Sequence, residues 1–497
     1  MFCRNFICKM CLIITAAAMT FASCEQKSAV YQAEKDLFRA RKMKHELSST
    51  TIKGEFLSRT LDTYRGIVRD YGDRPKRSAA LDTIIVTAQM EMAQLEFQTG
   101  MLDEAYRDFI RAADLSGDLP SAEANAIYSA AVISRELNDT ESARKHFSNF
   151  YEEFLSSPER PFRITLNRRY ILVPLELGHL YMGEGDRDRA DKWYDTAEEL
   201  YSYIIKSGQP QQLVKDAKLN RITAFLQREE WGKARSYLRE LKSEVSEAEK
   251  MPPLMYLEAR IELNGYGNRS EAIRILEDIE KRYPDSEEAS SALVTAAGIR
   301  FREENYSEAR KLCSRLIENY GNRKNEAAEA IWMLARMEEK SGDWLEASLH
   351  YRSLYTNYPY TLQGLEAPLK IASHFSDSGE NEVAGDAYTN AREHYRNLIR
   401  ESRSRGARIM AEKYLVRTYT EEGKWEEAVG KLLELVDSYP RYEHFRGNYL
   451  RAASICEQKL KDNRRAEEIL SICVEKYPGT SLAEEAEKQL DRIRSGK

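Results

Sequence analysis

Histidine and cysteine, the side chains best suited to metal binding or nucleophilic chemistry, are few in this sequence of 497 residues. None of its seven histidines has the partner four residues away that a zinc-binding helix needs. No cysteine pair has metal-ligand spacing, and neither a Gly-x-Ser-x-Gly elbow nor a phosphate-binding glycine loop occurs. We therefore predict that the chain is not an enzyme and needs no metal or cofactor. The histidines are His45, His146, His179, His350, His374, His394 and His444.

One cysteine does stand in a reactive context, at the end of a leader-like segment. Residues 1–23 carry Arg4 and Lys9, followed by an apolar run too short for a permanent membrane span. The small residues of Phe21-Ala22-Ser23 then lead directly into Cys24, which resembles the lipobox of bacterial lipoproteins. The resemblance implies that residues 1–23 are a signal peptide and that Cys24 becomes the acylated N-terminus, which anchors the chain to a membrane. An ordinary secretory signal with a cysteine placed by chance is the alternative.

The residue after Cys24 bears on localisation. Glu25 stands there, not the aspartate that resembles a retention signal for the inner membrane. We therefore expect a lipid-anchored protein of a Gram-negative outer membrane that faces the periplasm. No other stretch reaches the apolar length of a transmembrane helix.

Charge and cysteine content narrow the function further. The chain has 75 basic and 81 acidic residues, which argues against general binding of nucleic acid because such binding requires a strongly basic surface. Beyond the leader and Cys24, only Cys313, Cys456 and Cys473 remain, and an odd number makes a poor disulfide framework. We interpret them as small core residues, and leave open whether Cys456 pairs with Cys473.

The elements that would position any site are predicted from the stretch Ala327–Pro359. A first helix is expected to run to about Lys340, followed by the turn Ser341-Gly342-Asp343 and a second helix that Tyr358-Pro359 closes. Such a hairpin cannot bury both faces alone, so it must stack on copies of itself. The expected buried stripes are Ile331, Leu334 and Ala335 on the first helix, and Leu345, Ala347, Tyr351 and Leu354 on the second.

Copies of this hairpin recur along the chain in the register that Ala347 marks. Ten alanines recur at intervals of 37 to 47 residues, most of them followed four residues later by a large apolar residue. The register marks are Ala105, Ala143, Ala190, Ala234, Ala272, Ala309, Ala347, Ala384, Ala428 and Ala466. Three residues before four of these marks stands an aromatic: Trp231, Tyr306, Trp344 and Trp425. Thr60 occupies the same register in an atypical first hairpin, whereas Ile222, Arg260 and Ser454 depart from the small-residue pattern of first helices.

This pattern resembles the tetratricopeptide repeat family from roughly Ala88 to the C-terminus. The matching positions are Leu177-Gly178, Tyr181, Ala190, Tyr194 and Ala197, with closing prolines at Pro284, Pro359, Pro440 and Pro478. The resemblance implies an all-α fold, a right-handed superhelical solenoid of stacked antiparallel helix hairpins. We expect a tether and amphipathic helix over residues 24–56 and a solenoid of about ten to eleven repeats over residues 57–497.

The leader and the repeats together resemble a narrower group. With the closing sequence Tyr477-Pro478-Gly479-Thr480-Ser481, they are similar to BamD-type lipoproteins of the outer-membrane β-barrel assembly machinery, although this chain has about twice as many repeats. The resemblance implies a non-enzymatic, lipid-anchored scaffold that binds protein partners in outer-membrane protein assembly or another envelope process. The alternative is a nutrient- or glycan-binding lipoprotein of the SusD type.

The predicted partner site lies on the concave face, which the first helices of such a solenoid line. A partner's extended peptide or helix would lie there, opposite the buried stripe, where Trp332, Arg336 and Glu339 share one face of a helix. A Trp with an Arg one turn later is a plausible anchor pair, but Trp332 packed in the core is the alternative. Equivalent positions in other repeats are Tyr128, Arg135, Leu175, His179, Met182, Lys413 and Arg417.

Overall fold

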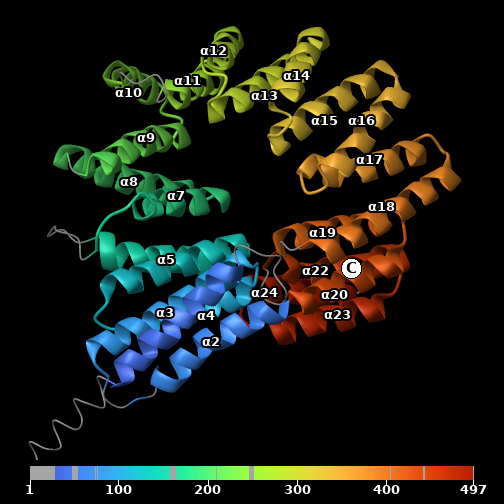
Figure 1. The fold of residues 1–497 in the computed structure, drawn as a ribbon. Helices are drawn as coiled ribbons and strands as arrows, with labels where there is room; N and C mark the ends of the chain where they lie inside the picture. Colours follow the sequence, from blue (N-terminus) through green and yellow to red (C-terminus); the bar gives the residue numbers. More distant parts are fainter. Residues whose placement is uncertain are drawn as a thin grey trace, which may run out of the picture. The chain divides into compact units, whose positions relative to one another are not determined.

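The computed structural model describes residues 28–47, 54–72, 74, 77–156, 164–208, 210–245, 251–402, 405–439 and 443–495. Within these ranges the chain consists of helices and their connections, without strands (Figure 1). The all-α prediction is confirmed, and the architecture is a helical repeat solenoid. The leader and Cys24 lie outside the described residues, so the predicted signal peptide and acylation site stay predictions. No helix in the described ranges is both long and apolar enough to cross a membrane.

The chain divides into two compact units, Met1–Ala190 and Asp191–Lys497. The first contains a helix at residues 28–47, then α2 (Gly54–Gly72), α3 (Ala79–Gln98), α4 (Leu102–Leu115), α5 (Pro120–Glu136), α6 (Thr140–Phe150), which a π-helical turn at Tyr151–Leu155 extends, a 3-10 turn at Tyr170–Leu172 and α7 (Val173–Gly183). Helix α8 (Arg187–Ser207) contains the boundary between the units.

The second unit continues the same alternation of first and second helices. It contains α9 (Gln211–Gln227), α10 (Trp231–Glu244), α11 (Met251–Arg260), α12 (Arg269–Arg282), α13 (Glu287–Arg302), α14 (Tyr306–Tyr320), α15 (Lys324–Ser341) and α16 (Trp344–Asn357). It ends with α17 (Leu362–Asp377), α18 (Asn381–Glu401), α19 (Arg405–Glu422), α20 (Trp425–Ser438), α21 (Glu443–Arg446), α22 (Asn448–Ile455), α23 (Asn463–Lys476) and α24 (Ser481–Ser495).

The alanine register describes the hairpins correctly. All ten marking alanines are buried and lie on the second helix of a hairpin. In the α15–α16 hairpin, Ala335 and Ala347 belong to one core cluster, and Gly342 makes the turn with a φ of 82°, which glycine adopts without strain. Small residues are needed at these marks because paired helices approach most closely there.

The helix at residues 28–47 belongs to the first of these cores. Its Ala33, Leu37 and Ala40 are buried against α2 and α3, and Thr60 of α2 is fully buried in the alanine register. The helix and α2 therefore form the atypical first hairpin. The predicted solenoid boundary at residue 57 falls inside α2.

One predicted core residue is wrong. Leu345 is 74% exposed, whereas Ala347, Tyr351 and Leu354 of the same helix are fully buried. Leu345 and Ala347 are two residues apart, which places them about 200° apart around a helix, so they cannot share a face. The side chain of Leu345 instead adds apolar surface to the outer face of α16.

Two departures from the register coincide with π-helical turns. Residues Ile261–Gly265 and Cys456–Leu460 are π-helical and follow directly after α11 and α22. A π turn takes about one residue more than an α turn, so it absorbs an inserted residue while the flanking helix stays packed. This is the physical reason why the small-residue pattern shifts near Arg260 and Ser454.

The aromatic residues that precede four of the marks by three have a common role. Each opens a second helix and contacts the end of the following first helix. Trp344 stacks on His374 with ring centroids 3.4 Å apart, and the ring of Trp425 lies 5.2 Å from Lys459 Nζ. Trp231 lies so close to Gly265 that a Cβ there would be 2.6 Å from its Cγ atom. These aromatics are therefore packing contacts between consecutive repeats.

The contact of Trp231 with Gly265 predicts a local loss of stability. Gly265→Ala should lower the free energy of unfolding by about 1–3 kcal/mol, because the added methyl group overlaps the indole ring. Gly232→Ala, next to Trp231 on α10, is the matched control, since a Cβ there meets open space and alanine favours the helix. Thermal melting of both variants tests this; equal stability would contradict the packing role of Gly265.

Candidate functional site

The predicted anchor residues of α15 are engaged within their own hairpin. Trp332 is half-buried and meets the ring of Tyr351 edge-on, with centroids 5.3 Å apart. Arg336 Nε lies 3.2 Å from a carboxylate oxygen of Glu339, and the Tyr351 hydroxyl donates to the same oxygen at 3.0 Å. The structure thus brings Trp332, Arg336 and Glu339 to one face, as predicted, but Tyr351 joins them and ties them to α16.

The equivalent residues of α5 and α7 are also engaged. Tyr128 packs its ring against Phe147, Phe150 and Tyr170, with centroids 5.6 to 6.0 Å away. Arg135 Nη1 pairs with Glu176 at 2.6 Å, a contact between one first helix and the next. Burial lowers the pKa of His179, which favours the neutral imidazole.

Arg417 of α19 forms a two-pronged polar contact with the neighbouring first helix. The guanidinium of Arg417 donates to both carboxylate oxygens of Glu366 on α17, at 2.6 and 2.9 Å, and Tyr414 donates at 2.9 Å. Burial acts to raise the pKa of Glu366, but these donors hold it below its ordinary value. Lys413 lies 5.7 Å from the ring of Phe445, and burial lowers its pKa.

Contacts of this kind recur along the first helices of the second unit. Polar side chains reach from one first helix to the next, and we call the series the polar ladder. Its members are the Tyr256 and Thr295 hydroxyls at 3.0 Å, Ser291 with Glu326 at 3.4 Å, Gln363 with Glu329, and Arg417 with Glu366. The polar ladder holds consecutive repeats together, so much of the predicted binding surface is occupied by contacts within the solenoid.

The position of Trp332 leads to a stability prediction. Trp332→Ala should lower the free energy of unfolding by about 2 kcal/mol, because the indole packs on Tyr351 and the core below it. The exposed Leu362→Ala, at the start of the next first helix, is the control and should change stability little. Thermal melting of both variants tests whether Trp332 is a packing residue. An unchanged melting curve for Trp332→Ala would contradict this role and support the predicted partner site.

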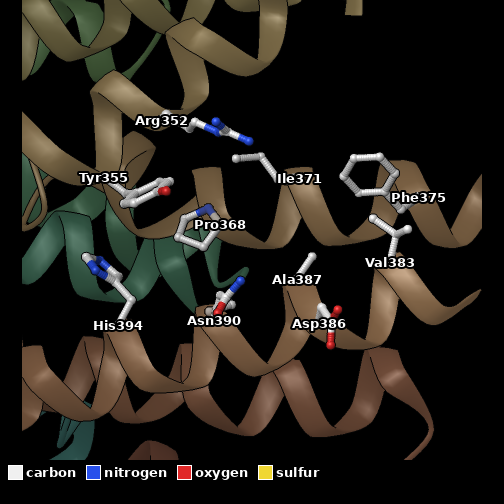
Figure 2. A pocket seen from close by; sticks show the side chains of 11 residues that line it. Arg352, Tyr355, Pro368, Ile371, Phe375, Val383, Asp386, Ala387, Asn390 and His394 are labelled. Atoms are coloured by element: carbon white, nitrogen blue, oxygen red, sulfur yellow. The ribbon is translucent and has the colours of Figure 1, made fainter. Parts of the chain in front are cut away.

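An open groove lies elsewhere, between the second helices α16 and α18 (Figure 2). Its cavity has a volume of about 410 Å³. Figure 2 shows Pro368, Ile371 and Phe375 of α17 along the floor, with α16 on one side and α18 on the other. The walls are Arg352 and Tyr355 from α16, and Val383, Asp386, Ala387, Asn390, Ala391 and His394 from α18.

The groove combines apolar and polar side chains. At one end, beside Phe375, Val383 is 43% exposed. At the other end the ring of His394 meets Tyr355 edge-on at 5.3 Å, and burial lowers the pKa of His394, so the imidazole is neutral near pH 7. The groove therefore offers apolar contact area with a few polar side chains along its walls, as binding pockets commonly do.

Two exposed leucines extend this apolar surface. Leu345 and Leu349 of α16 are 74% and 50% exposed. They precede the groove residue Arg352 by seven and three residues, so all three lie on one face of the helix. Large apolar side chains grouped beside a groove are typical of interaction surfaces.

Sequence reasoning missed this groove because it looked for a site on the first helices. The available signal was a set of apolar residues outside the buried stripe, namely Leu345, Leu349 and Val383. The prediction of Leu345 as a core residue hides the most exposed member of this set.

The described residues contain no group of three or more histidine, cysteine or acidic side chains that could hold a metal ion. Cys313, Cys456 and Cys473 are buried free thiols, so the disulfide left open between the last two is not formed. Burial raises the pKa of Cys313 to about 12 and that of Cys473 to about 11, which makes both poor nucleophiles.

Comparison with known proteins agrees with this fold. Residues 254–286, which span most of α11 and all of α12, match the tetratricopeptide repeat family model. No curated protein sequence matches the chain. Yeast Tom70 aligns at 13% identity over 93% of this chain and 96% of its own, with a TM-score of 0.40. A tetratricopeptide repeat protein from Parabacteroides merdae aligns at 15% identity over 60% of this chain and 99% of its own, also at 0.40. The chain is a helical repeat protein with a tetratricopeptide repeat at residues 254–286.

Proposed function

We propose that the chain is a non-enzymatic, lipid-anchored scaffold of the bacterial envelope, and that the groove between α16 and α18 holds a protein partner. The observation that carries this proposal is the open cavity of about 410 Å³ with its apolar floor and exposed apolar rim. Helical repeat proteins present extended surfaces for binding other proteins. The partners we expect are proteins of outer-membrane assembly or of another envelope process.

The shape and chemistry of the groove favour a helix as its occupant. Two helices, α16 and α18, flank a floor of apolar side chains, and a partner helix would place its apolar residues along that floor. Such a helix carries apolar side chains at positions i, i+3 or i+4, and i+7, which match a floor made by one face of α17. Arg352 and Asp386 on opposite walls would fix its orientation through charged or polar contacts.

The membrane part of the proposal rests on the leader sequence. The lipobox-like residues before Cys24 support acylation at that cysteine and removal of residues 1–23. The glycan-binding alternative loses support, because Trp231, Trp344 and Trp425 pack between repeats and do not form an exposed aromatic platform.

A charge placed in the groove should weaken partner binding without unfolding the protein. A photo-reactive amino acid in place of Asn390 would first crosslink the partner in cells and so identify it. The affinity of the purified protein for that partner would then be measured. Val383→Glu should reduce affinity by about tenfold or more, because it buries a carboxylate against the apolar floor. Ile472→Glu is the matched control, since Ile472 is also 43% exposed and lies on α23. Equal affinities of both variants would contradict the groove assignment.

The anchor is tested separately by cell fractionation. Cys24→Ser should move the protein out of the membrane fraction or leave its leader uncleaved, whereas Cys8→Ser, inside the leader, should change neither. A mature Cys24→Ser protein that still pellets with membranes after a high-salt wash would refute lipid anchoring.

A further inference from the structure

The first helix of the chain, at residues 28–47, has one face in the core and one face exposed. Ala33, Leu37 and Ala40 are buried against α2 and α3. On the opposite face Tyr31 is 64% exposed and Phe38 is 71% exposed. The spacing of seven residues puts the two aromatic rings on the same side of the helix, two turns apart. No described residue of the first unit covers these two rings.

Basic side chains surround these two rings. Lys35 lies between Tyr31 and Phe38 on the same face, and Lys42 follows Phe38 by four residues. Lys35, Lys42 and the neighbouring Arg39 are all exposed, and none of them forms an ion pair with another described residue.

Other charged residues of this helix form contacts with the rest of the first unit. Arg41 pairs with Glu91 of α3 at 2.6 Å, and Asp36 accepts a hydrogen bond from the Tyr71 hydroxyl at 3.0 Å. The exposed face therefore keeps three cations, with Glu34 as an exposed acidic residue at its edge. Exposed aromatics with lysines beside them are the composition of a helix that lies in a membrane interface, because lysine stems follow the apolar surface while their charges reach the headgroups.

We propose that the face formed by Tyr31, Lys35, Phe38, Arg39 and Lys42 lies on the anionic headgroup surface of a phospholipid bilayer. The inference rests on the proposed acylation of Cys24, and chain geometry links the two. Residue 28 is four residues after Cys24, and an extended chain spans at most about 3.6 Å per residue, so the helix begins within about 14 Å of the anchor. A tether this short keeps the face at high effective concentration at the membrane surface.

A fluorophore that senses its environment tests this contact. The full chain, processed in cells, would carry Phe38→Cys, labelled and reconstituted into phosphatidylglycerol vesicles that contain a lipid-borne quencher. Leu345→Cys is the matched control, because Leu345 is 74% exposed but lies on α16. The native thiols at 313, 456 and 473 are buried, which directs the label to the new cysteine.

We expect a blue-shifted, quenched emission at position 38 and not at position 345. Lys35→Glu with Lys42→Glu should reduce the quenched population roughly tenfold or more, because basic residues near an anionic surface each add to binding. The quenched population should also fall when phosphatidylcholine vesicles replace the phosphatidylglycerol vesicles, and when the salt concentration is high.

The outcomes separate this inference from the proposed function. An acylated, vesicle-bound protein whose label at position 38 stays unquenched would overturn the inference and leave the anchor standing. A protein that mass spectrometry finds without acyl chains would refute the anchor; its labelled form, mixed with the same vesicles, should still show quenching if the face binds lipid. A shift that depends on protein concentration and not on vesicles would assign the face to a second copy of the chain and overturn the inference.

Discussion

Glu422→Ala is expected to destabilise the hairpins around α18 and α19 by about 3 kcal/mol, because it leaves a buried guanidinium without its counter-ion. The side chain of Arg392 is 5% exposed and that of its partner Glu422 is 15% exposed. Among the described residues, Arg392 would then keep its bond to the Thr389 hydroxyl, at 2.9 Å, and its contact with the ring of Tyr419, at 5.2 Å. Neither can replace a carboxylate.

The matched control for this variant removes a glutamate from an exposed pair. Arg464 and Glu468 on α23 are 91% and 61% exposed, so Glu468→Ala should cost less than about 1 kcal/mol. Hydrogen exchange read by mass spectrometry would locate the damage. Because repeats couple mainly to their neighbours, protection should fall in α17 to α20 and stay unchanged in α3 to α6. Uniform loss of protection would contradict the coupling of repeats to their nearest neighbours. Equal losses of stability in the two variants would contradict the argument from burial.

The hairpins could be predicted from the sequence because their determinants are local. A small residue is required wherever two paired helices touch most closely, so the marks at Ala347 and its equivalents repeat whatever the surrounding residues are. The turn at Gly342 follows from the left-handed backbone there, which glycine adopts most easily. The prediction for Leu345 is wrong because its spacing of two residues from Ala347 places it on the opposite side of the helix, where it is exposed.

The candidate site depends on contacts that are distant in sequence. Arg417 and Glu366 are 51 residues apart, and only the stacking of α19 on α17 brings them together. Whether a charged residue on a first helix is free or paired therefore depends on the next repeat, which local periodicity does not describe. The groove has the same origin, since its walls come from α16 and α18 with α17 between them.

Glu96 of α3 is a buried acid whose environment favours the protonated form. Its side chain is fully buried, and one carboxylate oxygen has no hydrogen-bond partner among the described residues. Burial raises the pKa of Glu96 to about 8; the Asp108 carboxylate nearby raises it too, whereas Arg65, at 3.3 Å, acts to lower it. In the unfolded chain the same carboxyl group should titrate near its ordinary pKa of about 4.5.

This difference makes the stability of the first unit depend on pH. Between about pH 4.5 and pH 8 the folded protein holds a proton that the unfolded chain has lost, so unfolding releases a proton and stability falls as pH rises. Above the folded pKa both states are ionised, and the burial cost of the carboxylate is fully felt. Glu96→Gln keeps the shape without the titration, so its stability curve should lack this fall. We expect the variant to exceed the wild type by roughly 2 kcal/mol at about pH 9, but not at about pH 5.

Hydrogen exchange in α3 and α4, corrected for intrinsic rates and compared at equal pH, would measure this difference. Glu91→Gln is a suitable control, because Glu91 lies on the same helix but its side chain is 24% exposed and paired with Arg41. Its loss should cost stability at both pH values, since it removes the ion pair with Arg41. If Glu96→Gln instead destabilised α3 and α4 equally at both pH values, Glu96 would have to be ionised in the folded protein, and its pair with Arg65 would outweigh the cost of burial.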